Sequence, residues 1–294
     1  MNDPRAVGPE LKRHETAPIR WLLIASAIAF LSLFLFIPLL VVFINAFRDG
    51  LALFLAAAAD PQTAAAIRLT LLVVALVLPL NVLFGLCAAW SITKFDFRGK
   101  NLLTTLIDLP LTVSPVISGS IFVLLFGAQG ALGPWLASHQ IRIVFAVPGI
   151  VLATLFVTFP YVARELIPLM QALGNDNEET AISLGAGSWQ IFWRVTLPNI
   201  KWALLYGIIL STARAIGEFG AVSVVSGHIR GKTITVPLHV EILYNEYNFV
   251  AAFSVASLLV LVSLLTLFLK RLAEWKRQQV FLENAEHGSQ GGGN

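Results

Sequence analysis

The sequence predicts an all-α, polytopic membrane protein with six transmembrane helices. Of its 294 residues, 57% are hydrophobic and only 13% are charged, and the mean hydropathy is +0.79. One soluble core does not need this much apolar surface. Apolar stretches of about 20 residues, the length that crosses the hydrocarbon core of a bilayer, lie at residues 21–47, 67–93, 102–126, 147–170, 202–225 and 249–269.

The basic residues predict the orientation of these helices. Near the ends of the expected spans, thirteen Lys and Arg residues fall on one side and five fall on the other. Lys and Arg are retained on the cytoplasmic side of a membrane, so both termini are expected there. This gives cytoplasmic tails at residues 1–20 and 272–294, on either side of a membrane domain at residues 21–271. The net charge of +3 is then an orientation signal, and no basic cluster is dense enough to suggest nucleic acid.

Charged side chains also lie within the expected spans, where a charge is costly unless it is paired or hydrated. Arg214 and Glu218 are four residues apart on one helix and can face each other across a turn. Asp108 and Arg164 lie at similar depths, about 10 Å from the cytoplasmic ends of neighbouring spans. These two residues can therefore also meet.

Two interpretations of these charges stay open. They can form ion pairs that only hold helices together, or they can line a path for an anion. In the second case, arginine would be a transient partner of the anion and serine hydroxyls would donate hydrogen bonds to it. The candidate residues for such a path are Asp108, Ser114, Ser118, Arg164, Arg214 and Glu218.

The inner loop at residues 171–201 has more structure than a connection between two helices requires. Asp176, followed three residues later by Glu179, has the form of a capping box, in which side chains bond the free amides at a helix start. Gly185 stands where a helix ends in a left-handed residue. A short helix is therefore expected at about residues 177–184.

A second short helix is expected directly after this glycine. Ser188 can cap it, and Pro198 would end it. Between them, Trp189, Phe192 and Trp193 would share one face. Amphipathicity alone leaves open whether this element lies in the lipid headgroups or has another role.

The spacing within this loop resembles the EAA loop of permease subunits from ATP-binding-cassette importers. The matching residues are Glu179, Ala181, Gly185, Val195, Leu197 and Pro198. Thr180 stands where the family has alanine, and Val195 replaces the usual isoleucine. Three further stretches, "TKFDFRGK", "WALLYG" and "STARAIGEFGAVSVVSGHIRGKT", extend the resemblance. Taken together, residues 21–270 resemble sulfate/thiosulfate importer permeases of the CysW type.

The resemblance implies the fold of a type I importer permease, with a cytoplasmic coupling helix that docks on an ATPase. The coupling residues would be Glu179, Ala181, Gly185, Trp189, Leu197 and Pro198. The implied partners are a second, related permease, an ATPase dimer that holds ATP and Mg, an external sulfate-binding protein and the lipid bilayer of a bacterial inner membrane. A molybdate or tungstate importer is the alternative, because molybdate permeases have a stretch similar to "GEFG".

Other classes of protein fit the sequence less well. The motif "GHIRGKT" has three residues where a phosphate-binding loop has four, so ATP is expected on a separate chain. The five histidines all lie outside the expected spans, which leaves the intramembrane serines without a catalytic base; neither an enzyme nor a catalytic residue is expected. His139, His228 and His239 match no metal-ligand spacing. An ATP-independent channel or carrier would leave the inner loop unexplained.

Overall fold

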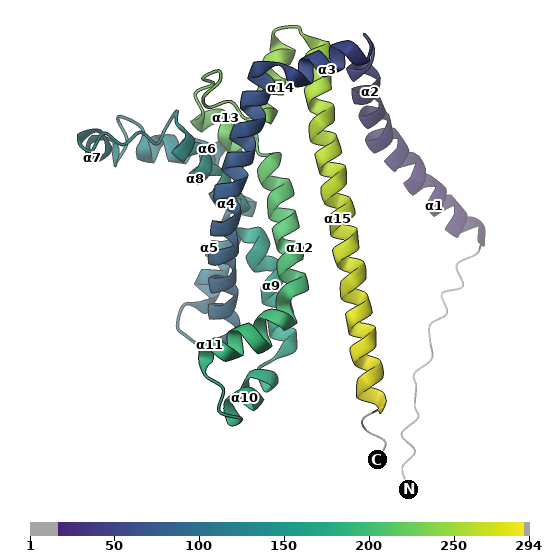
Figure 1. Cartoon of the computed structure of the whole chain (residues 1–294), viewed down its shortest axis with the longest axis vertical. Coiled ribbons are helices and arrows are strands. Elements are labelled where there is room, and N and C mark those ends of the chain that lie inside the picture. The colour runs from purple at the N-terminus through teal and green to yellow at the C-terminus, as the bar shows by residue number, and fades with distance from the viewer. Residues whose placement is uncertain (1–16, 291–294) are drawn as a thin grey trace.

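The computed structural model describes residues 17–290, whose regular structure is helical throughout (Figure 1). This confirms the all-α class. The helices of the expected spans are α1 (Ala17–Leu31), α2 (Ile37–Ala46), α4 (Pro61–Lys94), α5 (Lys100–Thr112), α6 (Pro115–Phe126), α8 (Val147–Thr158), α9 (Pro160–Leu173), α12 (Leu197–Ile216), α13 (Gly220–Val225) and α15 (Phe249–Gln290). Residues 1–16 and 291–294 of the expected tails lie outside the described part.

The loops between these spans carry short helices. The outer loops contain α3 (Leu51–Ala59), α7 (Gly133–Ser138) and α14 (Val236–Asn245), and the inner loop contains α10 (Asp176–Ser183) and α11 (Ser188–Ile191). Two single π-helical turns, η1 (Ser32–Phe36) and η2 (Phe192–Thr196), interrupt α-helical segments. In Figure 1, α3 and α14 lie at one end of the bundle and α10 and α11 at the other.

Four helical segments in the described range are long and apolar enough to cross a membrane: Pro18–Ala46, Pro61–Lys94, Val147–Leu173 and Phe249–Leu269. The pair α5–α6 makes a fifth if its two bent halves count as one span. The 20-residue α12 does not meet the criterion, because polar residues near its ends, among them Lys201 and Arg214, lower its mean hydropathy. The number six therefore stays a prediction, while the membrane-protein class holds.

Two of the expected spans are broken helices. Residues 102–126 form α5 and α6, which meet at an angle of 107°. Pro115 disfavours a helical conformation of the preceding residue, and Ser114 is accordingly extended (φ −57°, ψ 135°). Residues 202–225 are divided between α12 and α13, with a break at residues 217–219.

The two broken spans pack against each other through glycines. A Cβ atom at Gly119 of α6 would lie 2.7 Å from the carbonyl oxygen of Ala221 in α13. A Cβ atom at Gly220 would lie 3.0 Å from the Cβ atom of Pro115. Because larger side chains would separate these backbones, the glycines fix the break of one span beside the break of the other.

The centre of the bundle is formed by α4, α9 and α12. Val162 of α9 is fully buried and faces a glycine on each neighbouring helix. A Cβ atom at Gly85 of α4 would lie 2.7 Å from the Cβ atom of Val162, and one at Gly207 of α12 would lie 3.1 Å from its Cα atom. One turn closer to the start of α4, the buried amide of Asn81 donates to Thr158 Oγ1 at 2.7 Å and to Ser211 Oγ at 2.8 Å. This amide joins α4 to both α8 and α12.

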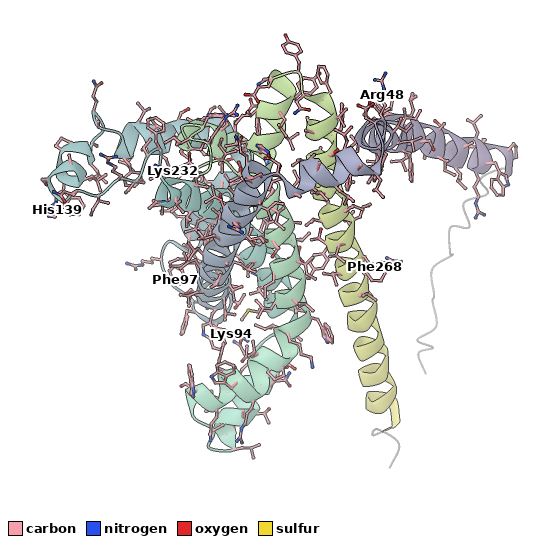
Figure 2. All side chains as sticks on the ribbon, turned by 45° about the horizontal axis from the view of Figure 1, so that its top comes forward. Arg48, Lys94, Phe97, His139, Lys232 and Phe268 are labelled. Atoms are coloured by element: carbon pink, nitrogen blue, oxygen red, sulfur yellow. The ribbon has the colours of Figure 1, made fainter. Side chains whose placement is uncertain are left out.

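The segment α1–η1–α2 lies apart from this bundle (Figure 1). In its most apolar window none of the described side chains is buried, and only its second half, α2, packs against α15. Figure 2 shows Arg48 and Lys232 toward the end formed by the outer loops and Lys94 toward the inner loop. Lys94, expected on the inner side, is thus separated along the bundle from Arg48 and Lys232, expected on the outer side.

Candidate functional site

The inner loop begins with α10, whose first turn is acidic. Asp176, Glu178 and Glu179 lie where a helix N-terminus favours negative charge. The expected capping box is wrong: Asn175 is the N-cap residue, and among the described residues its side chain makes no capping bond. Asp176 is already helical, because the N–H of Glu179 donates to Asn175 O at 2.9 Å, and so it cannot cap the helix. The side-chain oxygen of Asn175 accepts a hydrogen bond from Lys94 Nζ instead, at 2.9 Å.

The turn after α10 confirms the predicted left-handed glycine. Gly185 has φ +83°. Its N–H donates to Ile182 O at 2.8 Å, and the N–H of Ala186 donates to Ala181 O at 3.0 Å. These two bonds form a Schellman motif, which ends the helix at a fixed angle.

The second element of the loop differs from the expectation in both its start and its end. Gly187 is the N-cap of α11, and its N–H donates to Gln190 Oε1 at 3.2 Å, so Ser188 is not the cap. Pro198 does not end the element, because the chain continues through η2 into α12. In η2 the N–H of Leu197 bonds Phe192 O, five residues back. Pro198 then falls in the first turn of α12, where its missing N–H is not needed.

The aromatic residues of this element gather on one face, as predicted. The ring centroids of Trp189, Phe192 and Trp193 lie 5.3–6.0 Å apart, and Trp90 of α4 lies 5.5 Å from Phe192. Phe192 thus packs toward the bundle. Trp189 is 74% exposed, and the Leu184 side chain at the turn is 84% exposed. The tip of the loop therefore presents apolar surface away from the bundle.

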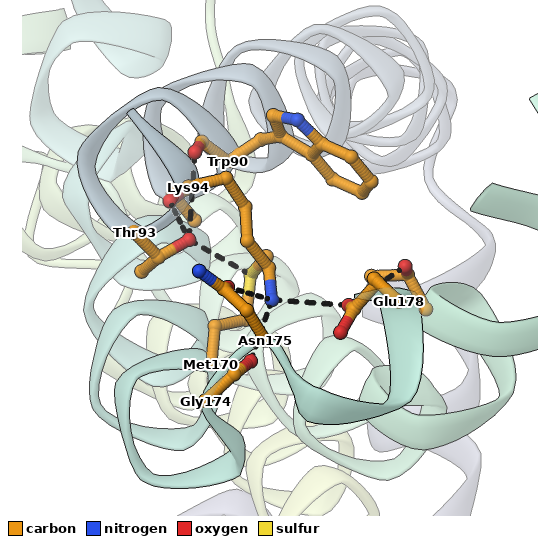
Figure 3. Close-up of polar contacts among 9 residues, drawn as sticks. Trp90, Thr93, Lys94, Met170, Gly174, Asn175 and Glu178 are labelled. Carbon is orange, nitrogen blue, oxygen red and sulfur yellow. Dashed lines mark hydrogen bonds and ion pairs between the residues drawn. The ribbon is translucent and has the colours of Figure 1, made fainter. Parts of the chain in front are cut away.

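Sequence reasoning missed a polar cluster that holds this loop against α4 (Figure 3). Lys94, the last residue of α4, lies 3.0 Å from Glu178 Oε1 and donates to Gly174 O at 2.7 Å. Thr196 of η2 donates to the same Glu178 oxygen at 3.1 Å. Lys94 and Glu178 are 84 residues apart, so no helical or strand spacing could have paired them.

The expected meeting of Asp108 and Arg164 is confirmed. Arg164 Nε of α9 lies 3.6 Å from Asp108 Oδ1 of α5. The two side chains are 59% and 43% exposed, respectively. The pair bridges two helices and still leaves the guanidinium group open on one face of the chain.

The expected pairing of Arg214 and Glu218 is also confirmed, in a much more buried place. Arg214 Nη1 lies 2.5 Å from Glu218 Oε2, and the glutamate side chain is 1% exposed. The other oxygen, Oε1, accepts the N–H of Ala221 at 2.8 Å, in the first turn of α13. Glu218 therefore holds the charge of Arg214 and the start of α13 together.

The two candidate serines differ in accessibility. Ser114 is exposed at the break between α5 and α6, whereas Ser118 is buried and donates to Ser114 O at 3.2 Å. Gly220, at the start of α13, approaches Pro115 closely, which places Ser114 near the break that follows Arg214 and the end of α12. Asp108 lies on α5, six residues before Ser114, and the helix ends between them. The candidates thus form two groups, one at the pair of Asp108 and Arg164 and one at the two helix breaks.

The outer histidines do not come together. His139 Nδ1 lies 2.8 Å from Trp135 O, His228 Nε2 lies 3.6 Å from Glu241 Oε2, and His239 Nε2 lies 3.0 Å from Thr63 Oγ1. Within residues 17–290, no group of three or more His, Cys, Asp or Glu side chains is placed to hold a metal ion.

The relatives of the chain are membrane components of transport systems. Residues 81–279 match the family described as "binding-protein-dependent transport system inner membrane component". The sulfate transport system permease protein CysW of Escherichia coli K12 is 48% identical over 284 residues, which are 96% of each chain. The CysW protein of Synechococcus elongatus is 52% identical over 252 residues, 86% of this chain and 88% of its own. The CysT protein of Escherichia coli K12 is 35% identical over 245 residues, 83% of this chain and 88% of its own.

A solved structure has the same fold. A chain of a bacterial alginate ABC transporter, in complex with an alginate pentasaccharide-bound periplasmic protein, superposes with a TM-score of 0.73 at 16% identity, over 89% of this chain and 94% of the other. The apolar helices agree with a multi-pass membrane protein. The chain belongs to the family of binding-protein-dependent transport system inner membrane components.

Proposed function

We propose that this chain is a permease subunit of an ATP-driven importer of sulfate and thiosulfate, and that it forms half of the translocation path. The observation that carries the proposal is the inner loop, a rigid two-part element with an exposed apolar tip, in a chain whose relatives are named sulfate transport permeases. Exposed apolar surface of this kind marks a contact site, and in a transport permease an ATPase would supply the covering surface. The similarity to CysW and CysT relatives favours sulfate over molybdate.

The partners follow from the same reasoning. A second, related permease would complete the path, a cytoplasmic ATPase dimer would bind ATP and Mg, and an external binding protein would deliver the anion. Both termini, with the tails at residues 1–20 and 272–294, would lie in the cytoplasm, on the side of α10 and α11. The chain itself would catalyse no reaction. Moving a dianion inward against an inside-negative potential costs about 4.6 kcal/mol per 100 mV, which explains the need for ATP.

The inner loop would couple the ATPase to the membrane helices. Glu179 and Trp189 are exposed on α10 and α11, where an ATPase can contact them. Ala181 and Gly185 form the Schellman turn that fixes the angle between these helices. Leu197 and Pro198 continue the loop into α12, so movement of the tip would be carried along a helix of 20 residues, about 30 Å.

The anion path would pass the two arginines. An accessible guanidinium can hold a passing dianion by charge-assisted hydrogen bonds, as Arg164, 59% exposed, and Arg214, 29% exposed, would do, with Ser114 as an additional donor. Asp108 and Glu218 would hold these arginines in place between transport cycles. Ser118 would act indirectly, because its hydroxyl is bonded to the backbone at Ser114.

The test of coupling compares two glycines in the same turn. Gly185 has φ +83° and Gly187 has φ −75°, and a Cβ atom at either would meet no atom within 4 Å. Gly185→Val therefore adds only backbone strain, about 1–3 kcal/mol, and Gly187→Val adds none. In reconstituted complexes, we expect Gly185→Val to lower both sulfate uptake and the stimulation of ATP hydrolysis by the loaded binding protein, about fivefold or more for a strain of this size.

Gly187→Val is the matched control and should leave both rates as in the wild type. Equal behaviour of the two variants, with normal assembly, would contradict a coupling role of this loop. Uptake that continues at the wild-type rate without any ATPase in the membrane would contradict the importer itself.

A further inference from the structure

The ammonium group of Lys94 is held by the inner loop at every one of its donor positions. A lysine ammonium has three N–H donors. Lys94 Nζ lies 2.7 Å from Gly174 O, 2.9 Å from Asn175 Oδ1 and 3.0 Å from Glu178 Oε1 (Figure 3). The side chains of Lys94 and Glu178 are only 11% and 17% exposed. The end of α4 is therefore bound firmly to the start of α10.

The same cluster extends to the beginning of α12. Thr196 is 2% exposed and donates to Glu178 Oε1 at 3.1 Å. The remaining space between these groups is a cavity of only about 10 Å³, whose lining includes Lys94, Glu178 and Thr196. Lys94 and Glu178 together thus connect α4, the α9–α10 connection and η2, with little room for any of these segments to shift alone.

A second lysine near the same end of α4 shows that this arrangement is not typical of the surface. Lys100 lies 3.2 Å from Asp96, four residues earlier, in a pair whose lysine is 32% exposed and whose aspartate is fully exposed. Exposed ion pairs of this kind contribute little to the stability of a protein, whereas removing one partner of an enclosed pair lowers the stability strongly. The Lys94 pair is the enclosed kind and joins distant segments.

We propose that Lys94 and Glu178 are positioning residues that attach α4 to the coupling loop. The proposal rests on the coupling role of the inner loop proposed above. The loop is covalently continuous with α9 and α12, whereas α4 is joined to it by side chains, through this cluster and the packing of Trp90 on Phe192. An apolar cluster that includes Ala89 and Ile200 adds to the packing between them. The lysine attachment makes α4, a helix of 34 residues that begins at the outer end, move together with α12 when the loop is displaced. Asn81 joins the same two helices at a higher level through Ser211.

Loss of the attachment should lower the efficiency of coupling. Without Lys94, a displaced loop would still move α12 but would slide past the end of α4, so ATP would be hydrolysed with less transport. Coupling between two sites is typically worth a factor of about 5 to 150. We therefore expect Lys94→Met, which keeps most of the aliphatic stem, to lower the number of sulfate ions imported per ATP hydrolysed by about fivefold or more.

The experiment measures this ratio, together with the amount of assembled complex, in proteoliposomes that contain the complete transporter and its binding protein. Glu178→Gln is the second variant; its amide oxygen can still accept from Lys94 and Thr196, so it preserves packing and removes the charge. Lys100→Met is the matched control for loss of a lysine and should leave the ratio unchanged. A normal ratio in both Lys94→Met and Glu178→Gln would overturn the proposal, as would an equal fall in Lys100→Met.

The outcome separates this inference from the proposed function. If Gly185→Val lowers uptake and the stimulation of ATP hydrolysis while Lys94→Met leaves the ratio normal, the loop couples but the lysine attachment is not part of its action. If Gly185→Val leaves both rates normal and Lys94→Met leaves the ratio normal, the coupling role of the loop itself is overturned. If Lys94→Met gives fewer assembled complexes but a normal number of sulfate ions imported per ATP hydrolysed, Lys94 serves folding alone and the proposal is also overturned.

Discussion

The two arginine–carboxylate pairs of the bundle have the same chemistry and opposite surroundings. Arg214 and Glu218 lie 2.5 Å apart with the carboxylate almost fully enclosed, while Arg164 and Asp108 lie 3.6 Å apart with both side chains about half exposed. Removing one partner of an enclosed pair costs about 3–5 kcal/mol, whereas an exposed pair contributes about 0–1 kcal/mol. One pair is therefore expected to determine structure, and the other is free to act on a passing anion.

The largest expected effect is that of breaking the enclosed pair. Arg214→Gln leaves Glu218 charged and enclosed without a partner, and we expect most of the assembled complex to be lost. The double variant with Glu218→Gln removes both charges, and the new amide oxygen can still accept the N–H of Ala221. Assembly should then recover, which is measured as complex per amount of membrane.

The double variant also tests whether Arg214 meets the anion. A neutral amide cannot replace the attraction of a cation for a dianion, so uptake should stay low although assembly is normal. Wild-type uptake in the double variant would restrict Arg214 to holding the helix break together and would remove it from the path.

The exposed pair of Arg164 and Asp108 should show the reverse pattern, with normal assembly of the complex and a loss of uptake from a single substitution. Arg164→Gln is expected to leave assembly within about 1 kcal/mol of the wild type. If the guanidinium group binds the anion, its loss removes a charge-assisted hydrogen bond of about 1.5–3 kcal/mol, and initial sulfate uptake should fall about tenfold or more. Unchanged uptake would show that the pair of Arg164 and Asp108 only holds helices together. Arg98→Gln, in the connection between α4 and α5, is the control for losing one arginine.

A buried histidine near the outer loops, His239, extends the comparison of ion pairs to a titratable group without an ionic partner. The smallest effect on stability is expected here. His239 of α14 is 2% exposed, and burial lowers its pKa below the usual 6.5, although Asp60 acts in the opposite direction and Arg230 in the same one. Below pH 6.5 the unfolded chain therefore takes up a proton that the folded chain resists. Stability should fall as the pH decreases through this range, by at most about 1.4 kcal/mol per pH unit.

The measurement is the apparent midpoint of thermal unfolding at pH 7.5 and pH 5.5. The midpoint should fall on acidification in the wild type and fall less in His239→Gln, whose amide can still bond Thr63. An identical pH dependence in the two proteins would contradict this account of His239.

Local sequence rules predicted the parts of the molecule that depend on neighbouring residues. Gly185 was predicted as a left-handed residue because few other residues adopt positive φ without strain, and it has φ +83°. The spacing of Arg214 and Glu218 was sufficient to pair them, since residues four apart on a helix are adjacent. Asp108 and Arg164 were matched by depth alone, because the length per residue of a helix is constant.

Contacts between distant segments could not be predicted in this way. Nothing in the spacing of Lys94 relates it to Glu178 or to Asn175, whose side chain it bonds. Pro198 was expected to end a helix, because proline usually does so; a wide turn placed it in the first turn of α12 instead. Residues 102–126 were predicted as one span, whereas the chain bends by 107° there, beside the close packing of Gly119 and Gly220 between α6 and α13.

The break between α5 and α6 also limits what can surround this edge of the subunit. The first N–H groups of α6 have no carbonyl partner within their own helix, and Ser114 offers them no side-chain acceptor in the described structure. In hydrocarbon, such unsatisfied backbone groups are prohibitive, so irregular backbone at this depth is found only against protein or water. Since Gly220 brings the second break to the same place, the lipid boundary of the assembled transporter must pass around this edge and leave it to a neighbouring subunit or to a hydrated passage.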